Sequence, residues 1–74
     1  MTNADKLFEE LGYKKDEFKD EIDYSNYGAI NSNFIVFRKE HKTFYKTTNG
    51  EQGNITMQEL KAINEKVKEL RLAR

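Results

Sequence analysis

The stretch "NITMQELKAINEKVKEL" at residues 54–70 carries the most complete structural signature in the chain. Thr56 and Glu59 have the T-x-x-E spacing of a capping box, in which each side chain accepts a hydrogen bond from the backbone N–H of the other residue. Ile55 and Leu60 occupy the two positions of a hydrophobic staple. All of these signals place the start of a helix at the same point.

The helix that begins here is amphipathic. A single apolar stripe runs along it and predicts a helix over residues 57–72, and its members are Leu60, Ile63, Val67 and Leu70. The stripe also fits a coiled-coil seam, but two heptads are fewer than a coiled coil needs. Packing of the stripe on a sheet is therefore the better interpretation.

A shorter helix is predicted over residues 3–11. Its apolar positions recur at helical spacing, at Ala4, Leu7, Phe8 and Leu11. Thr2 or Asn3 is placed to cap its start. Gly12 follows at the position where a left-handed residue stops a helix, and Tyr13 sits where a Schellman turn returns an apolar side chain to the helix.

Three strands are predicted between the helices. "EIDYSNY" at 21–27 alternates apolar and polar residues, "NFIVFRKE" at 33–40 is apolar at four consecutive positions, and "TFYKTT" at 43–48 follows a short polar turn. The turns are short, so we expect antiparallel pairing between neighbours. Residues 14–21 have no clean period and are interpreted as a charged connection.

The predicted fold is α+β: a three-stranded antiparallel β-meander with an N-terminal and a C-terminal helix packed on one face, in the order α-β-β-β-α. The 74 residues leave room for one domain, spanning 1–74. Without cysteine, no disulfide or thiolate metal site supplements the small core.

Composition favours a folded, water-soluble chain. Hydrophobic residues make up 36% and charged residues 35%, and four Tyr and five Phe supply apolar surface that disordered chains usually lack. The N-terminal sequence lacks the apolar run of a signal peptide, and no segment is long and apolar enough to cross a membrane. We therefore expect a cytoplasmic protein with no membrane partner.

Residues suited to catalysis are few. His41 is the sole histidine and lies in a predicted turn, and neither Ser25 nor Ser32 lies in a nucleophile-elbow pattern. The acidic stretch fails the EF-hand test, because Tyr27 and Phe34 stand where calcium ligands are required. The sequence predicts a non-enzymatic protein with no cofactor and no metal site.

A binding surface is predicted on the sheet. Two helices cover one face, so the central strand exposes either Phe34 and Val36 or Ile35 and Phe37 on the other. We expect Ile35 and Phe37, with Tyr45, to contact a partner protein. The alternative is that residues 14–33 fold over this face. A second predicted contact is the acidic set Asp16, Glu17, Asp20 and Glu21.

At "LFEELGY", "KTFYK" and "ITMQELKAINEKVKEL" the chain resembles small uncharacterised proteins encoded by phages and prophages of Gram-positive bacteria. The resemblance implies an accessory protein that acts in the cytoplasm of the bacterial host. It further implies binding to a host macromolecule, with inhibition of a regulatory or defence protein, such as a CRISPR nuclease, as the expected outcome.

Two other functions are left open by the sequence. Lys61, Lys68 and Arg71 project along one flank of the C-terminal helix, where they are placed to meet the phosphates of a nucleic acid. A neutral net charge makes this partner less expected than a host protein. The other alternative is a structural homodimer formed through the apolar sheet face, so both a monomer and a homodimer are open.

Overall fold

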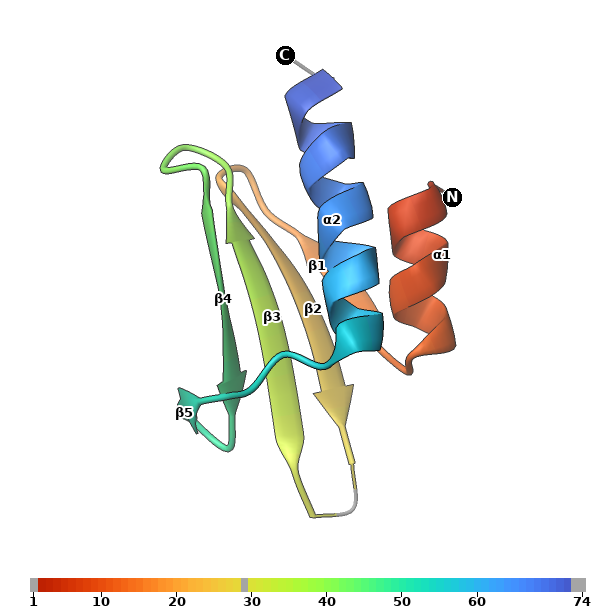
Figure 1. The fold of residues 1–74 in the computed structure, drawn as a ribbon. Helices are drawn as coiled ribbons and strands as arrows, with labels where there is room; N and C mark the ends of the chain where they lie inside the picture. The colour runs from red at the N-terminus through yellow and green to blue at the C-terminus, as the bar shows by residue number, and fades with distance from the viewer. Residues whose placement is uncertain (1, 29, 73–74) are drawn as a thin grey trace.

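Two helices lie on one face of a five-stranded antiparallel sheet in the computed structural model, which describes residues 2–28 and 30–72 (Figure 1). The elements are α1 (Asn3–Glu10), β1 (Lys14–Glu17), β2 (Glu21–Tyr27), β3 (Ser32–Arg38), β4 (Thr43–Thr48), β5 (Glu51–Gln52) and α2 (Met57–Leu72). The strands lie side by side in sequence order, so the sheet is a meander. The α+β class and the position of both helices on one face are confirmed, whereas the predicted count of three strands is wrong.

The two additional strands lie at the edges of the sheet. β1 is formed by residues that were interpreted as a charged connection, and all four of its residues are exposed. It pairs with β2 in a register that sets Lys15 opposite Tyr24 and Glu17 opposite Ile22. β5 adds only two residues, which pair with Thr47 and Thr48 at the end of β4.

The ends of α1 are fixed by the predicted residues. The Thr2 side chain accepts a hydrogen bond from the backbone N–H of Asp5 at 3.1 Å. At the other end Gly12 has φ +91°, and the N–H of Tyr13 donates to the carbonyl oxygen of Phe8 at 2.9 Å. This is the Schellman pattern, and it brings the Tyr13 ring edge-on to Phe8 at 5.8 Å.

The start of α2 is the predicted capping box. The Thr56 N–H donates to Glu59, and the Glu59 N–H donates to Thr56, both at 3.0 Å. The buried side of the helix is rotated from the predicted stripe, because Ala62, Ile63 and Lys66 are buried while Leu60 is 44% exposed. Within residues 2–28 and 30–72, no helix combines the length and apolarity that crossing a membrane requires.

The core fills the space between the helices and the inner face of the sheet. Its buried members come from α1, the α1–β1 turn, β2, β3 and α2: Phe8, Tyr13, Ile22, Tyr24, Ile35, Phe37, Ala62 and Ile63. Phe8 is at the centre, stacked on Tyr24 at 3.9 Å and edge-on to Phe37 at 6.2 Å. Such aromatic contacts add stability beyond the area that the rings bury.

One carboxylate on each helix, buried at Glu59 and partly buried at Asp5, joins the helices to the sheet. Glu59 on α2 accepts hydrogen bonds from Tyr13 Oη at 2.6 Å and from Lys46 Nζ at 2.7 Å. Asp5 on α1 accepts from Tyr24 Oη at 2.6 Å and from Lys15 Nζ at 2.9 Å. Both carboxylates bind residues distant in sequence, so they fix the position of each helix on the sheet.

Candidate protein-binding face

The face of the sheet away from the helices is uncovered (Figure 1). Side chains alternate between faces along a strand, so Ile35 and Phe37 of β3 point inward and Phe34 and Val36 point outward. Ile35 is 0% and Phe37 2% exposed, because both pack beneath the helices. The predicted exposure of these two residues is therefore wrong, and the other pair of β3 occupies the outer face.

Residues 14–28 and 30–33 do not fold over this face. The described residues of the segment instead supply β1, β2 and the start of β3, which widen the sheet on one side. The outer face, as the name is used below, consists of the outward side chains Lys14, Asp16, Glu21, Asp23, Ser25, Tyr27, Phe34, Val36, Arg38, Thr43, Tyr45 and Thr47.

Aromatic side chains occupy the β2–β4 part of the outer face. Tyr27 meets Phe34 edge-on with ring centroids 5.5 Å apart. Tyr45 is 40% exposed, and the guanidinium of Arg38 lies 5.3 Å from its ring centroid. Val36 lies opposite Tyr45 in the strand register and is nevertheless buried. Tyr45 is exposed, but its predicted grouping with Ile35 and Phe37 on one face is wrong, because it lies beside Val36 on the opposite side of the sheet. It belongs there to a patch of rings around an aliphatic residue.

Carboxylates occupy the β1–β2 part of the outer face. Asp16 lies directly across from Asp23, and Glu21 is two residues before Asp23 on the same side of β2. Asp23 Oδ1 is buried and accepts no hydrogen bond from the described residues. Its partial burial and the neighbouring Glu21 and Asp16 carboxylates raise the pKa of Asp23 to about 6.

The structure divides the predicted acidic set. Asp16 and Glu21 lie on the outer face, whereas Glu17 points to the inner face and forms ion pairs with Lys15 at 3.3 Å and Lys39 at 3.2 Å. Asp20 lies in the β1–β2 turn. Asp23 was not among the predicted contacts, although the alternation of residues 21–27 already placed it opposite the apolar side of its strand.

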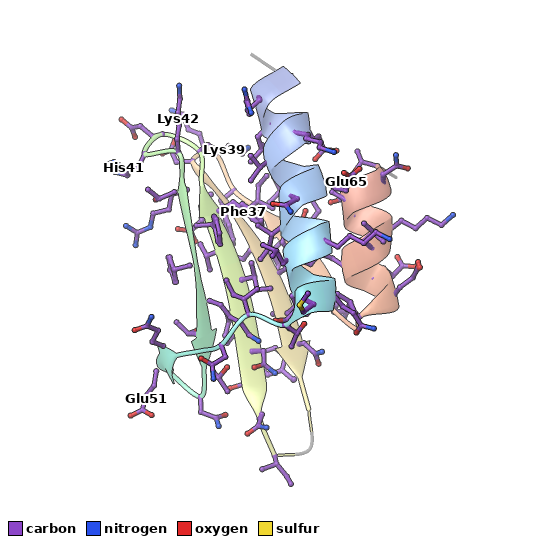
Figure 2. The ribbon with its side chains drawn as sticks, viewed as in Figure 1. Phe37, Lys39, His41, Lys42, Glu51 and Glu65 are labelled. Carbon is purple, nitrogen blue, oxygen red and sulfur yellow. The ribbon has the colours of Figure 1, made fainter. Side chains whose placement is uncertain are left out.

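The predicted basic flank of α2 is exposed but not uniformly positive. Lys68 forms an ion pair with the partly exposed Glu65 at 3.1 Å, and Figure 2 labels Glu65 on α2. Lys61 and Arg71 are exposed. His41 is also exposed, in the β3–β4 turn. Among residues 2–28 and 30–72, no three acidic or histidine side chains are arranged to hold a metal ion.

No family model matches the chain, and neither a curated protein nor a solved structure shows significant similarity to it.

Proposed function

We propose that this chain is a non-enzymatic binding module that docks a partner protein on its outer face. The observation that supports the proposal is a sheet with both helices on one face and an aromatic patch on the other. Exposed aromatic and apolar side chains gathered on one surface are typical of protein interfaces. Tyrosine and arginine, which meet here at Tyr45 and Arg38, are enriched among interface hot spots.

The charges of the outer face favour a basic protein surface as the partner. Asp16, Glu21 and Asp23 lie beside the aromatic patch and repel phosphate groups, which argues against nucleic acid on this face. A lysine or arginine of a partner would relieve the repulsion among these carboxylates and satisfy the Asp23 oxygen. The partner surface that fits is therefore apolar with a basic edge.

The resemblance to small phage-encoded proteins suggests where such a partner is found. A protein of this kind acts in the cytoplasm of an infected bacterium, and its partner is a host protein, with a defence nuclease or a regulator as the leading class. A sheet face that covers part of such a protein inhibits it by occupying its surface, with no chemical step required.

The test compares two aromatic residues of the same strand. Tyr45 on the outer face is 40% exposed and Phe44 on the inner face is 39% exposed, so substitution by serine removes a similar exposed ring from each side of β4. The immobilised wild type and both variants, each shown to be folded by circular dichroism, are incubated with lysate from a Gram-positive host. Captured proteins are identified by mass spectrometry, purified and titrated by calorimetry.

We expect the wild type and Phe44→Ser to bind the same host protein, and Tyr45→Ser to bind it at least tenfold more weakly, a loss of about 1.4 kcal/mol. Equal binding by Tyr45→Ser would overturn the assignment of the outer face. Light scattering over a concentration series covers the remaining alternative. A dimer that Tyr45→Ser dissociates would show that the face pairs with a second copy of the chain instead.

A further inference from the structure

A cleft of about 830 Å³ opens on the inner face of the sheet, between the C-terminal half of α2 and the β3–β4 hairpin. Small-molecule sites commonly have volumes of ~300–1,000 Å³. The floor of the cleft is apolar and is formed by Ile22, Phe37, Phe44, Val67 and Leu70. It opens on the opposite side of the sheet from the aromatic patch of the outer face, although Arg38 and Thr43 of the outer face also line it at the end of the β3–β4 hairpin.

The cleft is open because α2 does not extend over the inner side of β4. Phe37 on β3 is 2% exposed and lies between the sheet and α2 (Figure 2). Phe44, its direct cross-strand partner on β4, has its ring centroid 5.8 Å away and is 39% exposed. The aromatic surface of the core thus continues into the cleft, where a ligand can contact the Phe44 ring.

Basic side chains dominate the rim. Six lysines and arginines line the cleft, against the two carboxylates Glu17 and Glu69. Three of the lysines are neutralised by ion pairs: Lys15 with Asp5 and Glu17, Lys39 with Glu17, and Lys66 with Asp5 and Glu69. The Arg38 guanidinium lies over Tyr45.

Besides Arg38, the rim cations Lys42 and Arg71 form no ion pair within the part of the chain that the structure describes. They come from different walls. Lys42 lies in the β3–β4 turn, where its backbone has φ +54°, and Arg71 lies in the last turn of α2 (Figure 2 shows Lys42 and Lys39 at the end of the hairpin). Both cations line the same cleft.

We propose that this cleft binds a small amphiphilic carboxylate, with its apolar body on the Phe37–Phe44 floor and its carboxylate between Lys42 and Arg71. The apolar floor disfavours a purely polar anion such as free phosphate, since it offers such an anion no polar partner below the rim. The net positive rim disfavours cationic amphiphiles of the same length and gives a neutral amphiphile no charge attraction. An amphiphilic carboxylate suits both the apolar floor and the basic rim of the cleft.

Binding of an anion beside the C-terminal end of α2 requires nearby cations. The C-terminal end of an α-helix carries a partial negative charge, which repels an anion placed beside it. Arg71, in the last turn of α2, offsets that charge, and Lys42 approaches from the other wall. Removal of both cations should therefore weaken binding strongly, whereas removal of cations elsewhere on the protein should not.

The probe is decanoate, titrated below its micelle concentration into isotopically labelled protein and followed by two-dimensional NMR. Decyltrimethylammonium has the same chain with the opposite charge, and acetate has the same head group without the chain. The test variant is Lys42→Gln/Arg71→Gln. Its matched control is Lys6→Gln/Lys61→Gln, which removes two exposed lysines that do not line the cleft.

We expect saturable shifts of the Phe44, Val67 and Leu70 amides with decanoate, and none with acetate. The test variant should bind at least tenfold more weakly, and the control variant should bind within about twofold of the wild type. Phe44→Ser should also lose decanoate while it keeps the partner protein of the outer face. The proposal is overturned by absent or unsaturable shifts, by equal binding of decyltrimethylammonium, by unchanged affinity of the test variant, or by shifts centred on Phe34 and Tyr45.

Discussion

Asp16 of β1 and Asp23 of β2 lie directly opposite each other, so two carboxylates face one another across neighbouring strands on the outer face. Like charges in opposed positions of a sheet are destabilising. The Asp23 oxygen that is buried without a hydrogen-bond donor adds to this cost. The outer face therefore contributes less to the stability of the fold than the inner face does. Such a cost in stability is expected where a surface serves binding.

The Asp23 carboxyl should make the stability of the protein depend on pH between about 4 and 6. Its pKa is raised from 3.8 to about 6, first by burial and then by Glu21 and Asp16. The folded chain thus binds more protons than the unfolded chain in this window, so the free energy of unfolding falls as the pH rises through it. Urea unfolding at pH 5 and pH 7 measures the difference.

The Asp23→Asn variant supplies the comparison for this prediction. It should gain stability at pH 7, on the order of 1 kcal/mol, because the repulsion across the strands is removed. The free energy of unfolding of this variant should also differ much less between pH 5 and pH 7 than that of the wild type. Asp20→Asn, in the exposed β1–β2 turn, is the matched control. A wild type that is equally stable at both pH values would contradict the prediction.

The Asp5 carboxyl should make the free energy of unfolding rise with pH, which is opposite to the effect of Asp23, and should do so at lower pH. Burial tends to raise its pKa, but hydrogen bonds from Tyr24 and Lys15 and the charge of Lys66 lower it from 3.8 to about 2. The stability that it contributes is present above pH 3.8 and is lost as the pH falls through 2. Thermal unfolding at pH 4, 3 and 2 should show this loss, and Asp5→Asn should flatten it. An unchanged acid dependence in the variant would exclude Asp5 as its source.

Glu59→Gln should be strongly destabilising. Glu59 accepts hydrogen bonds from Lys46, Tyr13 and the α2 cap, and removal of its charge leaves Lys46 buried without a counter-ion. We expect a loss of about 3 kcal/mol or more, measured by denaturant unfolding. Adding Lys46→Met should recover part of it, since the buried charge is then absent.

The control for this ion pair is Glu65→Gln. Its pair with Lys68 is solvent-exposed, so its loss should cost about 0.5 kcal/mol or less. Equal effects of Glu59→Gln and Glu65→Gln would mean that the buried pair contributes no more than a surface pair.

The two faces of β3 should respond differently to the same substitution. Ile35→Ser places a hydroxyl in the core and should cost about 3 kcal/mol or more, enough to unfold a domain of this size. Phe34→Ser removes a half-buried ring and its contact with Tyr27, which should cost about 1 kcal/mol. Guanidinium unfolding of both variants tests the assignment of faces, and a less stable Phe34→Ser would reverse it.

The helices were predictable because their boundaries depend on local interactions. Thr56 and Glu59 hydrogen-bond to each other, and the N–H groups of Gly12 and Tyr13 donate to carbonyl oxygens of the preceding helical turn. The partners of each interaction therefore lie within a few residues in the sequence. β1 lacked such a signal. Its inward side chains, Lys15 and Glu17, meet charged residues instead of the apolar core, and no apolar period results.

The orientation of β3 was not predictable from its own residues, because Phe34 and Val36 are as apolar as Ile35 and Phe37. The register with β2 decides it: Phe37 pairs with Ile22 and Ile35 pairs with Tyr24, and that side receives Phe8 from α1. The pairing of β3 with β2 therefore determines which side chains of β3 belong to the outer face. The burial of Lys46 could not be predicted from its own strand either, because its counter-ion, Glu59, lies on α2.

The meander topology also affects the folding rate, because it sets the sequence separation of the strands that pair. Each strand pairs with its neighbour in sequence through a short turn, so the sheet requires only short loop closures, and such topologies fold faster than those built from distant pairings. The contact of Asp5 with Lys66 is different, because it joins residues 61 positions apart. We expect the helices to meet last, so that changes between α1 and α2 accelerate unfolding and leave the folding rate almost unaltered.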